Sequence, residues 1–150
     1  MAKITVIGIQ KFRDDIKAMG EDSAKMTVEM LKAGSSAAEE EWRKGIESET
    51  HKIINPDGKG YISKRGYIDT GDMLESVGTV IEEKKRRAKV YPLGYDGKGV
   101  PNAEKAFVLN YGTSSYKGSR FVDEINEKAD IEVPVAMAKV MDEYLKKHNL

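Results

Sequence analysis

The stretch Tyr-Ile-Asp-Thr-Gly-Asp-Met-Leu-Glu-Ser-Val, residues 67–77, marks the point where the chain changes character. Asp69 and Thr70 are residue types that cap helix N-termini, and Asp72 would place a negative charge in the first turn. Apolar side chains at helical spacing follow: Met73, Leu74 and Val77. This pattern predicts a short helix between an N-terminal helical half and a following sheet.

The letters Asp-Thr-Gly are also the signature of aspartic proteases, in which two carboxylates share one proton. Such an aspartate needs an apolar strand before it and a small residue after the glycine, so that two loops can approach closely. Here residues 66–68 are Gly-Tyr-Ile, and Asp72 follows Gly71, which would add a negative charge beside Asp69. Helix capping is therefore the better interpretation of this stretch.

The composition indicates one polar domain without a strong charge bias. The 150 residues can bury one modest core, and 39% are apolar while 33% are charged. Lys plus Arg equals Asp plus Glu at 25 each, which removes the general electrostatic argument for binding nucleic acid or anionic membranes. The chain has no cysteine, and its first apolar run is too short for a signal peptide or a membrane span, so we expect a cytosolic protein.

The N-terminal half is predicted to be mostly helical. Residues 4–9 form a β-branched run typical of a first strand, and residues 12–19 follow as a short helix ended by Gly20. A long helix is then expected from residue 24 to about residue 51, with Gly34 allowing a bend or a close helix contact. Its buried side would carry Ala24, Val28, Leu31, Ser35, Ala38, Trp42 and Ile46.

Residues 53–66 hold many turn-forming residues and are predicted to form a long loop. Tyr61 and Ile62 lie there beside the basic residues Lys59 and Arg65. Long loops inside compact domains are commonly functional. We therefore expect this segment to become ordered against a partner.

Two β-type runs, residues 78–82 and 87–92, surround a charged turn and predict a hairpin. The basic cluster of residues 84–87 lies at its tip. A solvated turn that discourages edge pairing is one interpretation of this cluster. Contact with phosphate or with an acidic neighbouring subunit is the other.

The C-terminal third returns to helix. A second glycine-rich loop, residues 93–101, precedes a helix that Asn102 could cap and in which Phe107 and Tyr111 share a face. After a polar loop at residues 113–119, helix is expected again from residue 120. Further features of this region are Pro134, placed to start or kink the last segment, and His148, placed in a frayed end.

Residues that could carry catalysis or bind metal are not found at suitable spacings. His51 and His148 lack companions at metal-ligand spacing, and a calcium loop in residues 55–66 would place Lys59 and Gly66 at ligand positions. The two glycine-rich loops lack the full phosphate-binding pattern, and Ser114 has no nucleophile-elbow context. We therefore predict no cofactor, no metal and no enzymatic activity.

Two boxes in order resemble the tail-completion family of tailed bacteriophages, whose members are also described as neck, head-tail joining or tail-component proteins. The first box is matched by Asp69, Thr70, Gly71, Leu74 and Ser76, and the second by Phe107, Tyr111, Gly112 and Thr113. Family members usually have Ala-Pro before the first box and Pro-Phe-Leu after the second, where this chain has Tyr67-Ile68 and Ser119-Arg120-Phe121. These departures leave a tail terminator or another minor tail protein as alternatives.

The resemblance implies a structural virion protein that forms a hexameric ring at the head-proximal end of the tail. Its partners would be the head connector or stopper and the tail tube, and DNA would pass through the lumen without sequence-specific binding. The protein would be located in the tail neck after assembly in the host cytoplasm. A nucleic-acid-binding module using residues 84–87 is the alternative from another class.

The expected fold is α+β, with a small antiparallel sheet of three or four strands packed against the long N-terminal helix and C-terminal helices. A head-to-tail ring needs two different contact surfaces on each subunit. Candidate residues for these surfaces come from the loops and from the start of the last helix: Lys59, Tyr61, Ile62, Arg65, Tyr95, Tyr116, Arg120 and Phe121.

Overall fold

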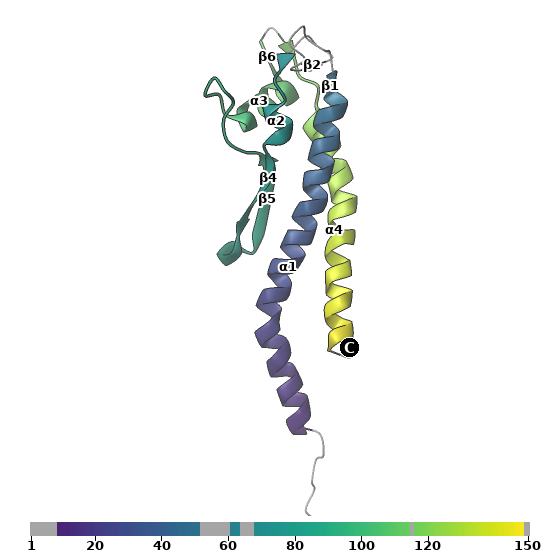
Figure 1. Cartoon of the computed structure of the whole chain (residues 1–150). Helices are drawn as coiled ribbons and strands as arrows, with labels where there is room; N and C mark the ends of the chain where they lie inside the picture. Colours follow the sequence, from purple (N-terminus) through teal and green to yellow (C-terminus); the bar gives the residue numbers. More distant parts are fainter. Residues whose placement is uncertain (1–8, 52–60, 64–67, 115, 149–150) are drawn as a thin grey trace, which may run out of the picture.

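The computed structural model describes residues 9–51, 61–63, 68–114 and 116–148. Two long helices, α1 (Ile9–Glu49) and α4 (Phe121–Lys147), run side by side in opposite directions, and α1 extends past the end of α4 (Figure 1). The smaller elements gather around the other end of this pair. The arrangement confirms the predicted α+β class.

The N-terminal helix is one uninterrupted element, so the predicted break at Gly20 is wrong. Ser23 directly precedes the predicted start of the second helix, but it donates its hydroxyl to the carbonyl of Gly20 at 2.8 Å within the continuous helix. A single glycine in a helix costs about 1 kcal/mol, which a 41-residue helix can absorb. Ile9 begins α1, and the rest of the predicted first strand lies outside the described residues.

The two long helices approach closely at two glycines of α1. A Cβ atom placed on Gly34 would lie 3.0 Å from Cγ of Met137 and 3.2 Å from Cγ1 of Val133. A Cβ atom placed on Gly45 would overlap the side chain of Ile125. The close contact predicted at Gly34 is thus confirmed, and Gly45 provides a second one.

The far end of α4 is docked against α1 rather than frayed. The Tyr144 hydroxyl donates to the carbonyl of Met19 at 2.9 Å, and the ring of His148 contacts the Tyr144 ring at a tilt, with centroids 4.5 Å apart. Nε2 of His148 lies 3.5 Å from a carboxylate oxygen of Asp22. The predicted fraying at His148 is therefore wrong, because α1 extends beside the end of α4. Pro134 lies inside α4, which continues through it.

The remaining elements are short. They are β1 (Thr50–His51), β2 (Tyr61–Ser63), β3 (Ile68–Asp69), α2 (Asp72–Glu75), β4 (Val77–Glu82), η1 (Glu83–Lys85), β5 (Arg87–Pro92), α3 (Asn102–Tyr111), β6 (Gly112–Thr113) and β7 (Tyr116–Lys117). The strands form three small antiparallel sheets, in the orders β1-β2-β3, β4-β5 and β6-β7. The predicted hairpin is confirmed as β4-β5, and β2 lies within the predicted loop 53–66, whose other residues are outside the described part.

One apolar core lies where α1, α2, α3, β4 and the start of α4 meet. Its buried side chains are Trp42, Ile46, Met73, Val77, Ala106, Leu109, Phe121 and Ile125. Phe121 meets Trp42 edge to face, with ring centroids 6.4 Å apart. The core therefore fixes the small elements on the helix pair. No helix in the described part of the chain is apolar over a length that could cross a membrane.

Candidate functional site

The first box forms the start of α2 and its link to β4. Gly71 is the N-cap residue with φ 89°, a left-handed conformation that glycine adopts without strain. Thr70 donates its hydroxyl to the carboxylate of Asp72, and Asp69 lies in β3. The prediction that Asp69 or Thr70 caps the helix is therefore wrong, because Gly71 takes the cap position without a side-chain hydrogen bond.

The rest of the first box holds α2 against the hairpin. Met73 and Val77 are buried in the core, as the spacing predicted, although Val77 already belongs to β4. Ser76 donates its hydroxyl to the carbonyl of Met73 at 3.0 Å, and its own carbonyl accepts from the Leu93 amide at 2.8 Å. These contacts give the first box a role in folding.

The second box ends α3, and part of it faces solvent. Phe107 is 61% exposed and Tyr111 is 54% exposed, and their rings lie 4.7 Å apart between centroids. The guanidinium of Arg120 lies 4.9 Å from the centre of the Tyr111 ring, within the range of a cation–π contact. Gly112 ends the helix with φ 83°. We name Phe107, Tyr111 and Arg120 the aromatic patch.

The base of the aromatic patch is held by a second set of hydrogen bonds. Asn110 is buried, and its side-chain oxygen accepts from the amide of Val122 at 2.9 Å. The backbone amide of Arg120 donates to the carbonyl of Asn110 at 3.1 Å, and Arg120 forms an ion pair with Asp123 at 2.5 Å. Arg120 has φ 65°, so a strained turn presents its side chain to Tyr111.

The candidate contact residues do not all belong to one surface. Tyr95 is 72% exposed in the loop before α3, and Arg120 is exposed within the aromatic patch. The prediction for Phe121 is wrong, because this side chain is buried in the core against Trp42. The others are placed as follows: Tyr61 and Ile62 lie in β2, Tyr116 lies in β7, and Lys59 and Arg65 are outside the described residues.

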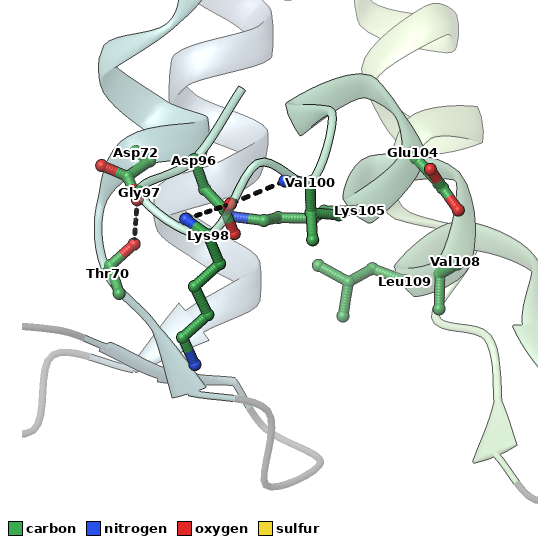
Figure 2. A pocket seen from close by; sticks show the side chains of 10 residues that line it. All are labelled: Thr70, Asp72, Asp96, Gly97, Lys98, Val100, Glu104, Lys105, Val108 and Leu109. Carbon is green, nitrogen blue, oxygen red and sulfur yellow. Dashed lines mark hydrogen bonds and ion pairs between the residues drawn. The ribbon is translucent and has the colours of Figure 1, made fainter. Parts of the chain in front are cut away.

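A cavity of about 500 Å³ lies between the first box, the loop before α3 and α3 itself (Figure 2). In it, Lys105 forms an ion pair with Asp96 at 2.7 Å, and both side chains are largely buried. The other carboxylate oxygen of Asp96 accepts from the amides of Lys98 and Val100, each at 2.8 Å. Lys105 and the Val100 amide lower the pKa of Asp96 to about 2. All these contacts favour ionised Asp96, so it anchors the loop rather than acting as a proton acceptor.

The loop before α3 is also tied to the helix through Asn102. This residue was predicted to cap α3, but Pro101 is the N-cap residue. The buried Asn102 side chain instead donates to the carbonyl of Leu93 at 2.9 Å, and its backbone amide donates to Gly94. Asn102 therefore closes the loop at its base.

One carboxylate, that of Glu82, partly neutralises the basic tip of the hairpin. Glu82 forms ion pairs with Arg87 at 2.6 Å, Lys89 at 3.0 Å and Lys85 at 3.2 Å. These cations, Arg87 foremost, lower the pKa of Glu82 to about 2. Two of the four residues in the predicted cluster thus interact with Glu82, which weakens the electrostatic basis for nucleic-acid binding.

Comparison with models of protein families, with curated proteins and with solved structures found no match for this chain. Within residues 9–51, 61–63, 68–114 and 116–148, no three His, Asp or Glu side chains are grouped so that they could hold a metal ion. The sequence had predicted that Phe107 and Tyr111 share a face, and their ring contact confirms it. It missed the contact of Arg120 with Tyr111, although the nearness of the two positions was a usable signal.

Proposed function

We propose that this protein is a structural subunit of a phage or phage-derived tail, where it forms a ring at the head-proximal end and joins the tail to the head connector. The observation that carries the proposal is the aromatic patch. It lies on the second of the two boxes that resemble the tail-completion family. The family resemblance supplies the place in the virion, and the patch supplies a surface suited to assembly.

The two boxes contain buried residues that stabilise the fold and exposed residues that can contact a partner. Met73 and Gly71 serve the fold, whereas Phe107 and Tyr111 expose large rings to solvent. Aromatic residues and arginine are enriched at the centres of protein interfaces, where they supply much of the binding energy. Arg120 over Tyr111 adds the third residue type of such a centre. A partner that covered the patch would remove apolar surface from water.

A hollow beside the aromatic patch could receive a side chain of that partner. Its volume is about 250 Å³. Phe107 and Tyr111 form part of its wall, and Trp42 and Tyr91 line it as well. An exposed aromatic pair next to an apolar hollow gives a surface with both a projection and a recess. Such a surface fits a specific protein contact better than a surface that is evenly polar.

The proposal predicts where the protein is found in a mature particle. Antibody raised against the purified chain should label the neck, between head and tail, in electron micrographs of virions from the source phage. Label at the distal tail tip would overturn the proposed position. So would unlabelled necks on particles in which mass spectrometry detects the intact chain.

The aromatic patch can be tested separately. The double variant Phe107→Ser/Tyr111→Ser should still fold, with only a small loss of thermal stability because both side chains are more than half exposed, and should fail to assemble. The matched control is Ile16→Ser, which removes an exposed apolar side chain of α1 outside both the patch and the candidate contact residues. Normal assembly of the double variant would show that the patch is not an assembly surface.

The alternative nucleic-acid-binding function depends on Lys84 and Arg86, since Glu82 engages their basic neighbours. It predicts DNA retention that falls steeply with salt and is lost when residues 84–87 are changed to serine. Retention that shows neither property would exclude this function. A tail terminator would instead show antibody label at the neck but no contact with the connector.

A further inference from the structure

Helix α4 carries an apolar stripe on the side that faces away from α1. Ile131 is 67% exposed and Val135 is 49% exposed. Ala138, one turn further along the helix, is exposed too. At 100° per residue these three positions lie on one side of the helix. We name Ile131, Val135 and Ala138 the α4 ridge. Pro134 and Met141 extend its edge.

A groove lies on the opposite side of α4, where α1, α4 and β5 meet. Its volume is about 280 Å³. Small residues are frequent in its lining: Gly34, Ser35, Ala38, Ala88 and Ala129. Apolar side chains, among them Val90 and Met137, complete it. We name this hollow the α1–β5 groove. Because small residues leave room for neighbouring side chains, it suits a ridge of branched aliphatic residues.

The two surfaces differ and lie on opposite sides of one helix. Val133 and Met137 of α4 line the groove, and they are separated by about half a turn from Ile131 and Val135 of the ridge. When the projection of one copy fills the recess of another, the two copies are arranged head to tail. Such heterologous contacts generate closed rings when the rotation between copies closes.

The charges around the two surfaces are complementary. Helix α4 contains seven acidic and four basic residues, whereas the hairpin of residues 77–92, which supplies the β5 wall of the groove, contains five basic and two acidic residues. Glu127 and Glu132 are exposed beside the ridge and form no ion pair with the described residues. At the hairpin tip, Lys84 and Arg86 are likewise exposed and form no ion pair with the described residues.

We propose that the α4 ridge of one copy docks into the α1–β5 groove of a second copy of this chain. The proposal rests on the ring assembly put forward above and specifies which two surfaces form the contact. The acidic outer side of α4 would then lie along the basic hairpin of its neighbour. Electrostatic attraction of this kind favours the correct orientation over a two-fold contact of ridge with ridge.

The absence of cysteine from the sequence makes cross-linking a clean test. Val135→Cys places a thiol on the ridge and Ala88→Cys places one in the groove. The two variants, mixed in equal amounts and oxidised, should give a disulfide-linked dimer, while each variant alone should stay uncross-linked. The chain carrying both substitutions should give a ladder of multimers on a non-reducing gel. Ile131→Cys serves as a second ridge position.

Three outcomes would overturn the proposal. Dimers from Val135→Cys alone would indicate a two-fold contact between ridges. An uncross-linked mixture, with both variants retaining the wild-type oligomeric mass, would place the contact elsewhere. The control mixture pairs Val135→Cys with Glu47→Cys, an exposed position on α1 outside both surfaces. If it gave as much disulfide-linked dimer as the mixture of Val135→Cys and Ala88→Cys, the cross-link would reflect random collision.

Charge reversal supplies a second test that does not depend on disulfide geometry. Glu127→Lys/Glu132→Lys should weaken self-association at least about tenfold at low salt, and less at high salt. Adding Lys84→Glu/Arg86→Glu to the same chain should restore it. Failure of both tests alongside normal neck labelling would refute this contact and leave the proposed function standing. Success of both tests with no label in virions would support this contact and refute the proposed function.

Discussion

Replacing Gly45 by alanine tests the close packing of α1 on α4. The added Cβ atom would overlap Cγ1 and Cδ1 of Ile125, a core residue that is only 2% exposed. Isoleucine is stiff at χ1, so it cannot turn aside cheaply, and either its rotamer or the helix spacing must change. Overpacking of this kind costs about 1–3 kcal/mol, and loss of part of the Ile125 burial could add about 1 kcal/mol.

Alanine also favours helix over glycine, by about 1 kcal/mol. The net result expected for Gly45→Ala is therefore a loss of about 1–3 kcal/mol of unfolding free energy. Gly20→Ala is the matched control in the same helix, because a Cβ atom there meets nothing within 4 Å. It should gain about 0.5–1 kcal/mol, so the same substitution should have opposite signs at the two sites.

Urea denaturation followed by circular dichroism measures both variants, with the slope checked for two-state behaviour. Ile125→Ala removes both atoms that clash with the added Cβ, so Gly45→Ala should cost less unfolding free energy in the Ile125→Ala background than in the wild type. If Gly45→Ala were as stable as Gly20→Ala, the crossing of the two helices at this glycine would be refuted. An equal loss in the Ile125→Ala background would show that the helix backbone, rather than Ile125, resists the added atom.

Two further predictions concern the loop before α3 and the hairpin tip. Lys105 and the Val100 amide hold the pKa of Asp96 at about 2, below its ordinary value of 3.8. Ionised Asp96 therefore stabilises the fold fully above its ordinary pKa, and this contribution is lost as the pH falls towards 2. The urea midpoint of the wild type should therefore fall more between pH 5 and pH 2.5 than that of Asp96→Asn, and parallel curves would contradict this assignment. Arg86 has φ 49°, a left-handed conformation that glycine adopts without strain, so Arg86→Gly should raise the unfolding free energy by up to about 1 kcal/mol. Lys84→Gly is the control and should not raise it. Equal effects of the two substitutions in thermal denaturation would count against a left-handed Arg86.

Local pattern was sufficient for much of the fold. The alternating runs around residues 83–86 predicted the hairpin, and the three- and four-residue steps through Trp42 and Ile46 predicted the long helix. Both signals depend only on neighbouring positions in the sequence. The expected single sheet is divided into three small ones, and most of their strands have only two or three residues.

The wrong predictions concern residues whose tertiary contacts outweigh their local conformational preference. Gly20 and Ser23 resemble a helix end followed by a cap, yet α4 docks beside this part of α1 and the helix continues. Phe121 follows a polar loop, which favours a contact residue at the surface, although the turn at Arg120 directs its side chain into the core. In each case the partner comes from a distant part of the chain, which local pattern does not specify.

The candidate site was predictable only in part. The shared face of Phe107 and Tyr111 follows from a four-residue step on a helix. The ion pair of Asp96 with Lys105 joins a loop to a helix, and the sequence offered only a loop of turn-forming residues there. The α4 ridge and the α1–β5 groove likewise depend on which side of each helix the partner covers, and that information is three-dimensional.

The central claim is that this chain carries surfaces for its own copies. The most direct test is the mass of the purified full-length protein in solution, measured by sedimentation velocity over a wide range of concentrations. We expect one closed species whose mass is a fixed multiple of the chain mass and does not grow further at high concentration. A monomer at every concentration, or an open series of ever larger species, would contradict the claim.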